Sequence, residues 1–330
     1  MKNIVVFGAT GNIGIYLVDH LVSTLSKVDY QIIAVGRKKT NLFESMNVPY
    51  YQIDITDKKQ FDKLELKDVY GVINLAGLLP AYSKDIDFIK YVNVNIIGSL
   101  NILEFARTHK AECFLYTQTW SDLAGYWGEE TVLHPYMPRK VCYDGDHAFY
   151  SLSKCFVVDS MELYHHQFGI RNFVFRLPNI YLYSPEKTYY VDGVNRPISY
   201  RYLIDRASQG KDIEIWGNPK AFKDIIYVKD LCEMMRLALL SNLDGGIYNA
   251  GTGVKTTLEE QIRGIIEVFC PKNKRSKVVY RPEKQSFPSF VMDIENAKKE
   301  LGYKPKYLYL DYLKDYKDEQ EKRRFDSLWQ

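Results

Sequence analysis

One pair of side chains in this sequence has the types and the spacing of an acid/base catalyst. Tyr150 and Lys154 stand one helical turn apart in a stretch that opens an apolar-patterned helix, so the phenol and the ammonium share a helix face. A nearby ammonium favours the phenolate and lowers the pKa of a tyrosine, which makes Tyr150 a usable acid/base near neutral pH. Thr119, which follows an upstream strand, supplies a hydroxyl that can hold a substrate oxygen. These residues predict an acid/base site in which Tyr150 is the acting group.

A glycine-rich turn near the start of the chain has the spacing of a phosphate-binding loop. A buried strand is predicted over residues 3–7, the turn occupies residues 8–14, and apolar residues then recur at helical spacing. Gly8 makes the tight turn, Gly11 permits close approach of a pyrophosphate, and Gly14 lets the helix pack on the strand. The alternative is a tight turn with no ligand. Its position between a strand and an amphipathic helix favours a bound dinucleotide.

Alternating strands and helices must position these groups. Further strands are predicted over residues 31–35, 50–53, 69–75 and 113–116. Such alternation is typical of a doubly wound parallel sheet, whose strands present their carboxyl ends to a ligand. Asp54 either accepts a hydrogen bond from an adenine amine or caps the next helix. Inside a helix predicted from about Tyr91 to Ala106, Asn95 needs a polar partner, which the next strand is available to supply.

The end of the second predicted strand bears on the choice of dinucleotide. An acidic residue there would bind the ribose 2′-hydroxyl of NAD, but the sequence has Gly36-Arg37-Lys38. Arg37 and Lys38 can pair with a 2′-phosphate, although an arginine can also lie over the adenine ring. The cofactor is therefore NADP or NAD, with NADP slightly favoured.

The bulk composition fits a soluble protein with a large core. The chain has 330 residues, 46% hydrophobic and 26% charged, with a net charge of +3 and dispersed Lys and Arg. These properties give no reason to expect nucleic acid or a membrane partner, and they favour a cytoplasmic location. The five cysteines form no CxxC pair and no metal-like spacing with histidine, so free thiols and no metal are predicted. The charged tail after Leu313 is predicted to be a solvated helix.

A set of motifs spread over nearly the whole chain carries a family resemblance. It comprises the glycine turn, Asp54-Ile55, Asn74-Leu75-Ala76-Gly77, Asn93-Val94-Asn95, Thr119, the stretch from Tyr150 to Lys154, Arg176 to Tyr181, Trp216-Gly217, Lys223 to Asp230, Tyr248 to Gly253, Arg281-Pro282, Asp293 and Ala297 to Pro305. With these residues the chain resembles the extended short-chain dehydrogenase/reductases, in the branch of NAD(P)-dependent nucleotide-sugar epimerases and dehydratases. The resemblance implies a Rossmann-type doubly wound parallel sheet with a smaller C-terminal α/β substrate lobe. The NAD(P)-binding domain would hold residues 1–178 and 223–250, and the substrate lobe residues 179–222 and 251–330.

The resemblance also implies roles for single residues. Tyr150 would be the acid/base, Lys154 would bind the nicotinamide ribose, and Thr119 would hydrogen-bond the reacting sugar oxygen. Asn179, Lys223 and Arg281 would reach the diphosphate of the substrate. The residues expected at the cofactor are Gly8, Thr10, Gly11, Asn12, Ile13, Gly14, Arg37, Asp54, Ile55, Leu75, Ala76, Gly77, Asn95, Tyr150, Lys154 and Pro178.

Three departures from the family pattern shape the prediction. Lys223 stands where the family usually has an arginine that binds the substrate diphosphate. The compact charge of an ammonium therefore replaces the planar, forked guanidinium at this contact. Thr119 is followed by Trp120-Ser121 rather than the Asp-Glu of the 4,6-dehydratases, which argues against a dehydratase. The longer segment 125–149 brings Cys142 and His147 near Tyr150, either as second acid/base groups or as packing and surface residues.

The leading functional prediction is a nucleotide-sugar epimerase. It would remove a hydride to its bound cofactor and return it to the other face of the sugar. The alternatives are an NADPH-dependent nucleotide-sugar ketoreductase and a non-enzymatic protein that senses dinucleotides. Retention of Thr119, Tyr150 and Lys154 together argues against the sensor, which needs only the binding residues. The resemblance further suggests a homodimer that pairs through the helices beginning near Tyr91 and Tyr150.

Overall fold

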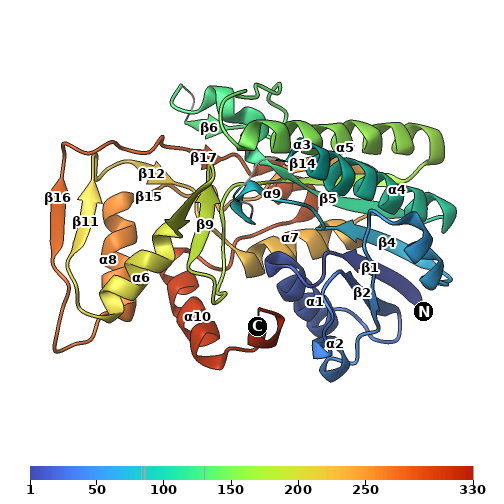
Figure 1. Ribbon diagram of the computed structural model, residues 1–330, viewed down its shortest axis with the longest axis horizontal. Coiled ribbons are helices and arrows are strands. Elements are labelled where there is room, and N and C mark those ends of the chain that lie inside the picture. The colour runs from blue at the N-terminus through green and yellow to red at the C-terminus, as the bar shows by residue number, and fades with distance from the viewer. Residues whose placement is uncertain (83, 85–86, 130, 330) are drawn as a thin grey trace.

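A parallel sheet of seven strands forms the centre of the molecule (Figure 1). The computed structural model describes residues 1–82, 84, 87–129 and 131–329. In pairing order the strands are β14 (Gly245–Asn249), β7 (Arg171–Leu177), β5 (Cys113–Thr119), β4 (Val69–Asn74), β1 (Lys2–Phe7), β2 (Tyr30–Gly36) and β3 (Tyr50–Gln52), and every neighbouring pair is parallel. The chain order reverses between β1 and β4, where a doubly wound sheet opens a crevice for a ligand. The predicted fold class is confirmed.

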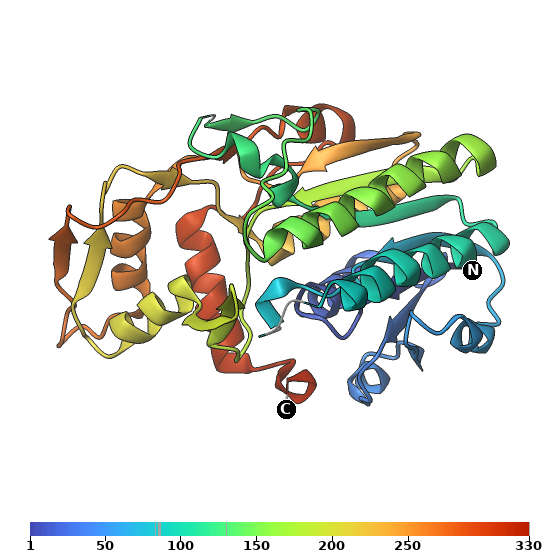
Figure 2. The same cartoon turned by 45° about the horizontal axis from the view of Figure 1, so that its top comes forward.

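Helices cover both faces of this sheet, because its strands are apolar on both sides. One face carries α1 (Asn12–Thr24) and α7 (Val228–Leu240), and the other carries α4 (Gly98–Thr108) and α5 (His147–Phe168). Figure 2 shows α4 and α5 side by side over the sheet. The helical run that ends in α4 starts earlier than predicted, with α3 (Phe88–Tyr91) and a π-helical turn (Val92–Ile97).

A second group of elements lies toward the left of Figure 1. It consists of α6 (Ser199–Ser208), α8 (Leu258–Phe269), α10 (Tyr309–Lys322) and the parallel pair β11 (Ile213–Trp216) and β16 (Val278–Arg281). The ring of Tyr312 on α10 lies 5.5 Å from the ring of Tyr181 and 5.2 Å from that of Tyr227. Because Tyr227 immediately precedes α7, this aromatic contact ties the second group to the central sheet.

The remaining elements are short. They are α2 (Leu42–Ser45), α9 (Glu295–Leu301), and the strand pairs β6 (Val132–Leu133) with β17 (Val291–Met292), β8 (Ile180–Tyr181) with β13 (Ile226–Tyr227), β9 (Thr188–Val191) with β10 (Val194–Pro197) and β12 (Phe222–Lys223) with β15 (Thr256–Thr257). Turns of 3-10 helix span Lys58–Lys63, Pro80–Tyr82, Trp120–Tyr126 and Asp326–Leu328. Most of these short strand pairs join segments that are distant in sequence. The pairs therefore fix the loops at the carboxyl edge of the central sheet.

The charged C-terminal tail packs against the rest of the chain instead of being fully solvated. α10 buries Tyr312, Leu313 and Tyr316 on one side. Beyond it, the ring of Phe325 meets the ring of Tyr16 on α1 at 5.1 Å. The predicted helix is therefore present, but apolar residues at helical spacing turn one side of it inward.

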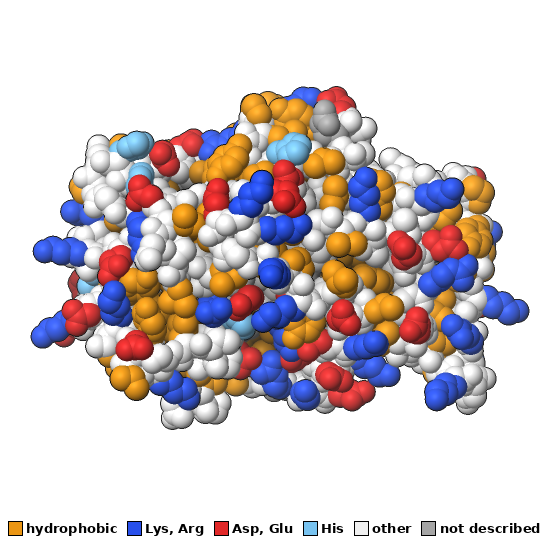
Figure 3. All heavy atoms as spheres, turned by 180° about the vertical axis from the view of Figure 1, so that it is seen from behind, with side chains coloured by type: hydrophobic (Ala, Val, Ile, Leu, Met, Phe, Trp, Pro, Cys, Tyr) orange, Lys and Arg blue, Asp and Glu red, His pale blue; other side chains and the backbone are white. Residues whose placement is uncertain are grey.

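The surface carries mixed charge. On the face shown in Figure 3, Lys and Arg are interspersed with Asp and Glu and with hydrophobic side chains. In the described ranges, no helix combines the length and the apolar character needed to cross a bilayer. α5 exposes Leu152, Phe156 and Leu163 by 41%, 47% and 51% along one side. Pairing of two subunits through this side stays a prediction, which sedimentation of the purified chain would measure.

Candidate active site

The turn between β1 and α1 leaves no room for side chains at two of its glycines. Gly8 has a φ of +81°, and a Cβ there would lie 2.6 Å from the backbone nitrogen of Ala76. A Cβ on Gly14 would lie 2.1 Å from the carbonyl oxygen of Gly8. Gly11 precedes α1 without a side-chain cap, and no acidic residue occupies the first turn of this helix. The first N–H groups of α1 are therefore available to an anion, and the turn fits the pyrophosphate of a dinucleotide.

The side chain of Asn12, in this turn, is contacted from three distant parts of the chain. Its Nδ2 donates to the hydroxyl of Tyr82 at 2.9 Å and to Oε2 of Glu186 at 3.0 Å. Its Oδ1 accepts from the indole Nε1 of Trp329 at 2.7 Å. These contacts hold the glycine turn to the 3-10 turn that ends at Tyr82, to the loop before β9 and to the C-terminal segment.

The residues expected to contact the adenosine half of a bound dinucleotide lie in different environments. Lys38 Nζ donates to the carbonyl of Leu328 at 2.7 Å, so its ammonium is already engaged. Arg37 is exposed, and its guanidinium has no hydrogen-bond or ion-pair partner among the residues that the structure describes. Asp54 Oδ1 accepts from the backbone nitrogen and the hydroxyl of Thr56 at 3.0 and 2.8 Å, which is a local capping arrangement. Of the two predicted cations, Arg37 is thus the one that stays unpaired within the described ranges.

Asn95 joins the end of β4 to the helix that carries Tyr150. Its Oδ1 accepts from the nitrogen of Leu78 at 2.7 Å, and its Nδ2 donates to the carbonyl of Leu78 at 3.1 Å and to Ser153 Oγ at 3.0 Å. Ser153 in turn donates to the carbonyl of Tyr150 at 2.7 Å. The expected partner on the following strand was wrong, because α5 packs directly on the π-helical turn. The side-chain amide of Asn95 therefore forms its hydrogen bonds within the protein, and these hydrogen bonds position α5.

Tyr150 and Lys154 do not perturb each other as the sequence predicts. Lys154 is only 4% exposed, and its Nζ lies 3.9 Å from the centroid of the Tyr116 ring. No carboxylate in the described ranges pairs with it, and burial lowers its pKa to about 7. Removal of the Tyr150 hydroxyl from water raises the pKa of that tyrosine. The predicted lowering of the Tyr150 pKa is absent in this structure, because desolvation dominates and the ammonium faces Tyr116.

Of the two further acid/base candidates, only His147 lies beside Tyr150. The His147 ring is 6.2 Å from the Tyr150 ring, and its Nδ1 is 2.6 Å from Oδ1 of Asp146. The Asp146 carboxylate also accepts from the backbone nitrogen of Asp192 at 2.8 Å. Cys142 is exposed, with its thiol toward Asp144.

Thr119 and Pro178 come together at the carboxyl edge of the sheet. Thr119 is in register with Leu177, the residue before Pro178. The Thr119 hydroxyl accepts from the nitrogen of Ser121 at 3.2 Å and lies 3.1 Å from its hydroxyl. A buried ion pair fixes this turn, since Arg176 Nε donates to the Asp122 carboxylate at 2.9 Å.

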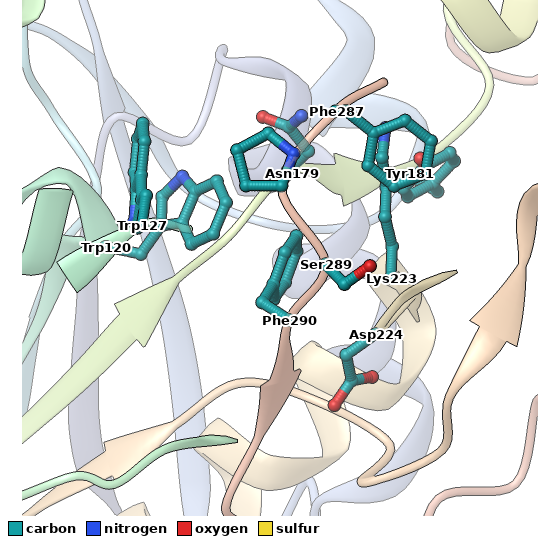
Figure 4. Close-up of a pocket in the computed structure, with 10 residues that line it drawn as sticks. Trp120, Trp127, Asn179, Tyr181, Lys223, Asp224, Phe287, Ser289 and Phe290 are labelled. Carbon is teal, nitrogen blue, oxygen red and sulfur yellow. The ribbon is translucent and has the colours of Figure 1, made fainter. Parts of the chain in front are cut away.

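A pocket of about 160 Å³ adjoins this edge (Figure 4). The predicted substrate residues Asn179 and Lys223 both line it. Lys223 Nζ lies 4.2 Å from the centroid of the Phe287 ring, and burial lowers its pKa. The adjacent Asp224 does not neutralise it, because that carboxylate accepts from Thr252, Gly253 and Met292. Among the described residues Lys223 has no acidic partner, so the pocket presents a positive charge to an anion.

Arg281, the third predicted substrate residue, lies outside the residues that line this pocket. It is exposed on β16, and its Nε donates to Oε1 of Glu214 at 3.0 Å. The structure thus brings Asn179 and Lys223 together and places Arg281 elsewhere.

Sequence reasoning missed the aromatic side of the pocket. The Trp120 ring lies 4.3 Å from the ring of Trp127 and 4.3 Å from that of Phe290. Because Trp120 directly follows Thr119, the sequence could have indicated that Trp120 lies at the site. Nothing in the sequence indicated Phe290, because it reaches the site only through the pairing of β17 with β6.

Comparisons with known proteins agree with this geometry. The family described as the NAD dependent epimerase/dehydratase family matches residues 4–251. A Methanocaldococcus jannaschii protein, provisionally named a UDP-glucose 4-epimerase, is 26% identical over 92% of this chain and 93% of its own length. The crystal structure of the UDP-glucose 4-epimerase of Thermotoga maritima with UDP-glucose is similar at a TM-score of 0.77, with 22% identity over 97% of this chain and 100% of that one.

A second solved structure is similar to the same extent. The UDP-glucuronic acid 4-epimerase of Bacillus cereus, in complex with NAD and a fluorinated UDP-glucuronic acid, has a TM-score of 0.74 and 20% identity, covering 97% of this chain and 100% of that one. The family match takes in the glycine turn, α5 and nearly all of the central sheet. The chain therefore belongs to the NAD dependent epimerase/dehydratase family.

Proposed function

We propose that this protein is a nucleotide-sugar epimerase that uses a bound NAD(P). Residues 1–178 and 223–250 bind the dinucleotide, and residues 179–222 and 251–330 bind the sugar nucleotide. The observation that carries the proposal is the unpaired Lys223 in a pocket beside Thr119, at the same sheet edge as a turn that fits a pyrophosphate. Relatives named as UDP-sugar 4-epimerases support the reaction and uridine diphosphate as the nucleotide.

In each reaction cycle one proton moves from the sugar hydroxyl to the protein and back. Tyr150 acts as a phenolate that takes the proton of the sugar hydroxyl as a hydride leaves the same carbon, and returns it when the hydride is restored on the opposite face. Because burial raises the pKa of Tyr150 in the ligand-free protein, this role requires the bound oxidised cofactor to supply a positive charge that favours the phenolate. Bound NAD(P) supplies the hydride acceptor and donor. Thr119 Oγ1 would hold the reacting sugar oxygen. When NAD(P) is bound, Lys154 would hold the nicotinamide ribose and Pro178 would border the nicotinamide.

The contacts on Asn12 support an epimerase over a ketoreductase. An epimerase restores its cofactor in every cycle and has no need to exchange it, whereas a ketoreductase must release NADP⁺. The three distant segments that meet Asn12 tie the glycine turn to the rest of the chain and favour retention. Identification of the cofactor released on denaturation separates the two: retained oxidised dinucleotide supports the epimerase, and an empty site contradicts it.

Arg37 gives the site affinity for a 2′-phosphate. Arg37→Ala should weaken NADP binding at least tenfold and leave NAD binding unchanged, since a charge-assisted hydrogen bond contributes about 1.5–3 kcal/mol. Fluorescence titration of cofactor-stripped protein with both dinucleotides measures this. Lys39→Ala, in the same exposed loop, is the matched control. A wild-type protein that already prefers NAD contradicts the idea.

Lys223 binds the diphosphate of the substrate. Calorimetry of cofactor-loaded protein with UDP, GDP, CDP and dTDP should show binding of at least one, and Lys223→Met should weaken it about tenfold or more. Arg281→Ala should have a smaller effect, because that guanidinium is paired with Glu214 outside the pocket. Lys220→Met, at an exposed neighbouring site, is the control. Absence of heat with every nucleotide would reject a nucleotide-linked substrate.

A further inference from the structure

The chain beyond α10 crosses to the glycine turn. In Figure 1 residues 323–329 leave the end of α10 and run toward α1. The carbonyl of Leu328 accepts from Lys38 Nζ at 2.7 Å, and the indole Nε1 of Trp329 donates to Asn12 Oδ1 at 2.7 Å. Residues 323–329, the C-terminal strap, are therefore bonded to two places at the carboxyl edge of the sheet.

These two contacts lie at either end of the region that the adenosine half of a dinucleotide occupies in a doubly wound sheet. The pyrophosphate binds at the first turn of the helix that follows β1, and Asn12 is the first residue of this helix. The adenosine ribose binds at the end of β2, and Lys38 lies just beyond Gly36, where β2 ends. The strap therefore bridges the pyrophosphate and ribose positions.

The strap makes these contacts without using the groups that bind an anion. Trp329 bonds to the side chain of Asn12, so the backbone N–H of that residue is untouched. Among the described residues, no atom of the strap accepts a hydrogen bond from the backbone at the start of α1. A pyrophosphate can therefore bind at the turn while the strap stays closed, since the strap and the anion use different atoms.

Further contacts anchor the strap on α1 and α10. The ring of Phe325 is buried against Tyr16 on α1, with the ring centroids 5.1 Å apart. Arg324 forms ion pairs with Asp19 on α1 at 2.9 Å and with Glu319 on α10 at 2.8 Å. The Glu319 side chain is only 4% exposed, so salt screens this second pair little. These anchors keep the strap next to the turn, so the hydrogen bond to the turn re-forms readily after it breaks.

We infer that the C-terminal strap is a gate over the adenosine half of the cofactor site, closed by the hydrogen bond from Trp329 to Asn12. This inference rests on the proposed function, in which the glycine turn binds NAD(P). The contacts that close the strap join residues of the chain to one another, so they form with and without the dinucleotide. The strap must therefore open for entry as well as for release, and it slows both steps. Slow release suits an epimerase, which restores its cofactor in every cycle.

The test measures both rate constants of cofactor binding by stopped-flow fluorescence. Mixing cofactor-stripped protein with NADH or NADPH gives the association rate constant, and a chase of the loaded protein with excess NAD⁺ or NADP⁺ gives the dissociation rate constant. Trp329→Phe keeps an aromatic ring but removes the donor to Asn12. Both rate constants should rise about 2- to 10-fold, the usual range for one neutral hydrogen bond, while Kd changes less than about twofold.

Two further variants assign the effect to this hydrogen bond. Trp216→Phe removes an indole hydrogen bond to Glu214 on β11 and should leave both rate constants unchanged. In an Asn12→Ala background, where the acceptor is already absent, Trp329→Phe should have no further effect on either rate constant.

Unchanged rate constants in Trp329→Phe overturn the inference. A rise in the dissociation rate constant alone also overturns it, because Trp329 would then be a direct contact of the dinucleotide. A rise in the association rate constant alone does so too, because the strap would then occupy the place of the dinucleotide. In each of these cases NADH or NADPH still binds, so the proposed function stands. If neither dinucleotide binds to the wild type, the proposed function fails and the inference fails with it.

Discussion

Replacing Tyr150 with phenylalanine should lower turnover by about 10²–10⁴ while the protein keeps its fold and its affinity for ligands. Phenylalanine preserves the ring contacts with Tyr91 and His147, whose centroids lie 6.4 and 6.2 Å away. The Tyr150 hydroxyl makes no hydrogen bond within the described ranges, so its removal leaves no buried partner unsatisfied. The substitution therefore isolates the proton that the residue exchanges.

The measurement is the rate of sugar interconversion by NMR, together with cofactor affinity by titration. Tyr143→Phe serves as a control, because Tyr143 is 78% exposed. A Tyr150→Phe protein that keeps most of its turnover would move the acid/base role elsewhere. His147→Ala and Cys142→Ala would then decide between the remaining groups, with His147 first because its ring lies beside Tyr150.

The sheet and its ligand edge could be predicted because their signals are local. Apolar runs such as residues 3–7 and 113–116 mark buried parallel strands, and the glycines at 8, 11 and 14 mark the turn that follows the first. Once the strand order is that of a doubly wound sheet, the carboxyl ends must share one edge. Thr119 and Pro178 accordingly lie at neighbouring strand ends.

Contacts between distant segments were beyond this kind of prediction. The next strand was considered available to supply a partner for Asn95, whereas Leu78, and Ser153 on α5, supply it. Asn95 lies in a π-helical turn, which helix propensities do not reveal. Arg281 was grouped with Asn179 and Lys223 by resemblance, but its exposed strand pairs it with Glu214. Side-chain direction decided each case, and spacing along the chain does not encode it.

The Tyr150–Lys154 pair shows a similar limit in its electrostatics. Helical spacing correctly places both groups on α5, and elementary charge interaction then predicts a lowered tyrosine pKa. The structure buries Lys154 almost completely and Tyr150 in part, so desolvation raises the pKa of Tyr150 and lowers that of Lys154. Burial depends on the packing of α5 against β5 and the π-helical turn, which a sequence pattern does not quantify.

Lys154→Met should abolish activity and at the same time stabilise the protein. Turnover and cofactor affinity should fall together, with turnover reduced at least about 10³-fold, because the change removes the nicotinamide-ribose contact that we propose for Lys154. The free energy of unfolding at pH 7 should rise by about 1–3 kcal/mol, since an apolar side chain of similar length replaces a buried cation that has no carboxylate partner.

The stability difference should depend on pH in a defined direction. The folded-state pKa of Lys154 is about 7 and the ordinary value is 10.5, so between these pH values the unfolded chain holds the proton that the folded chain has lost. The free energy of unfolding of the wild type therefore rises with pH across that window. The difference in free energy of unfolding between Lys154→Met and the wild type shrinks from pH 7 toward pH 10. Urea unfolding of the cofactor-free proteins at several pH values measures both trends, with Lys39→Met as an exposed control. A Lys154→Met protein that is less stable than wild type at pH 7 would mean that the Tyr116 ring outweighs desolvation, and that Lys154 is held as a favourable buried cation.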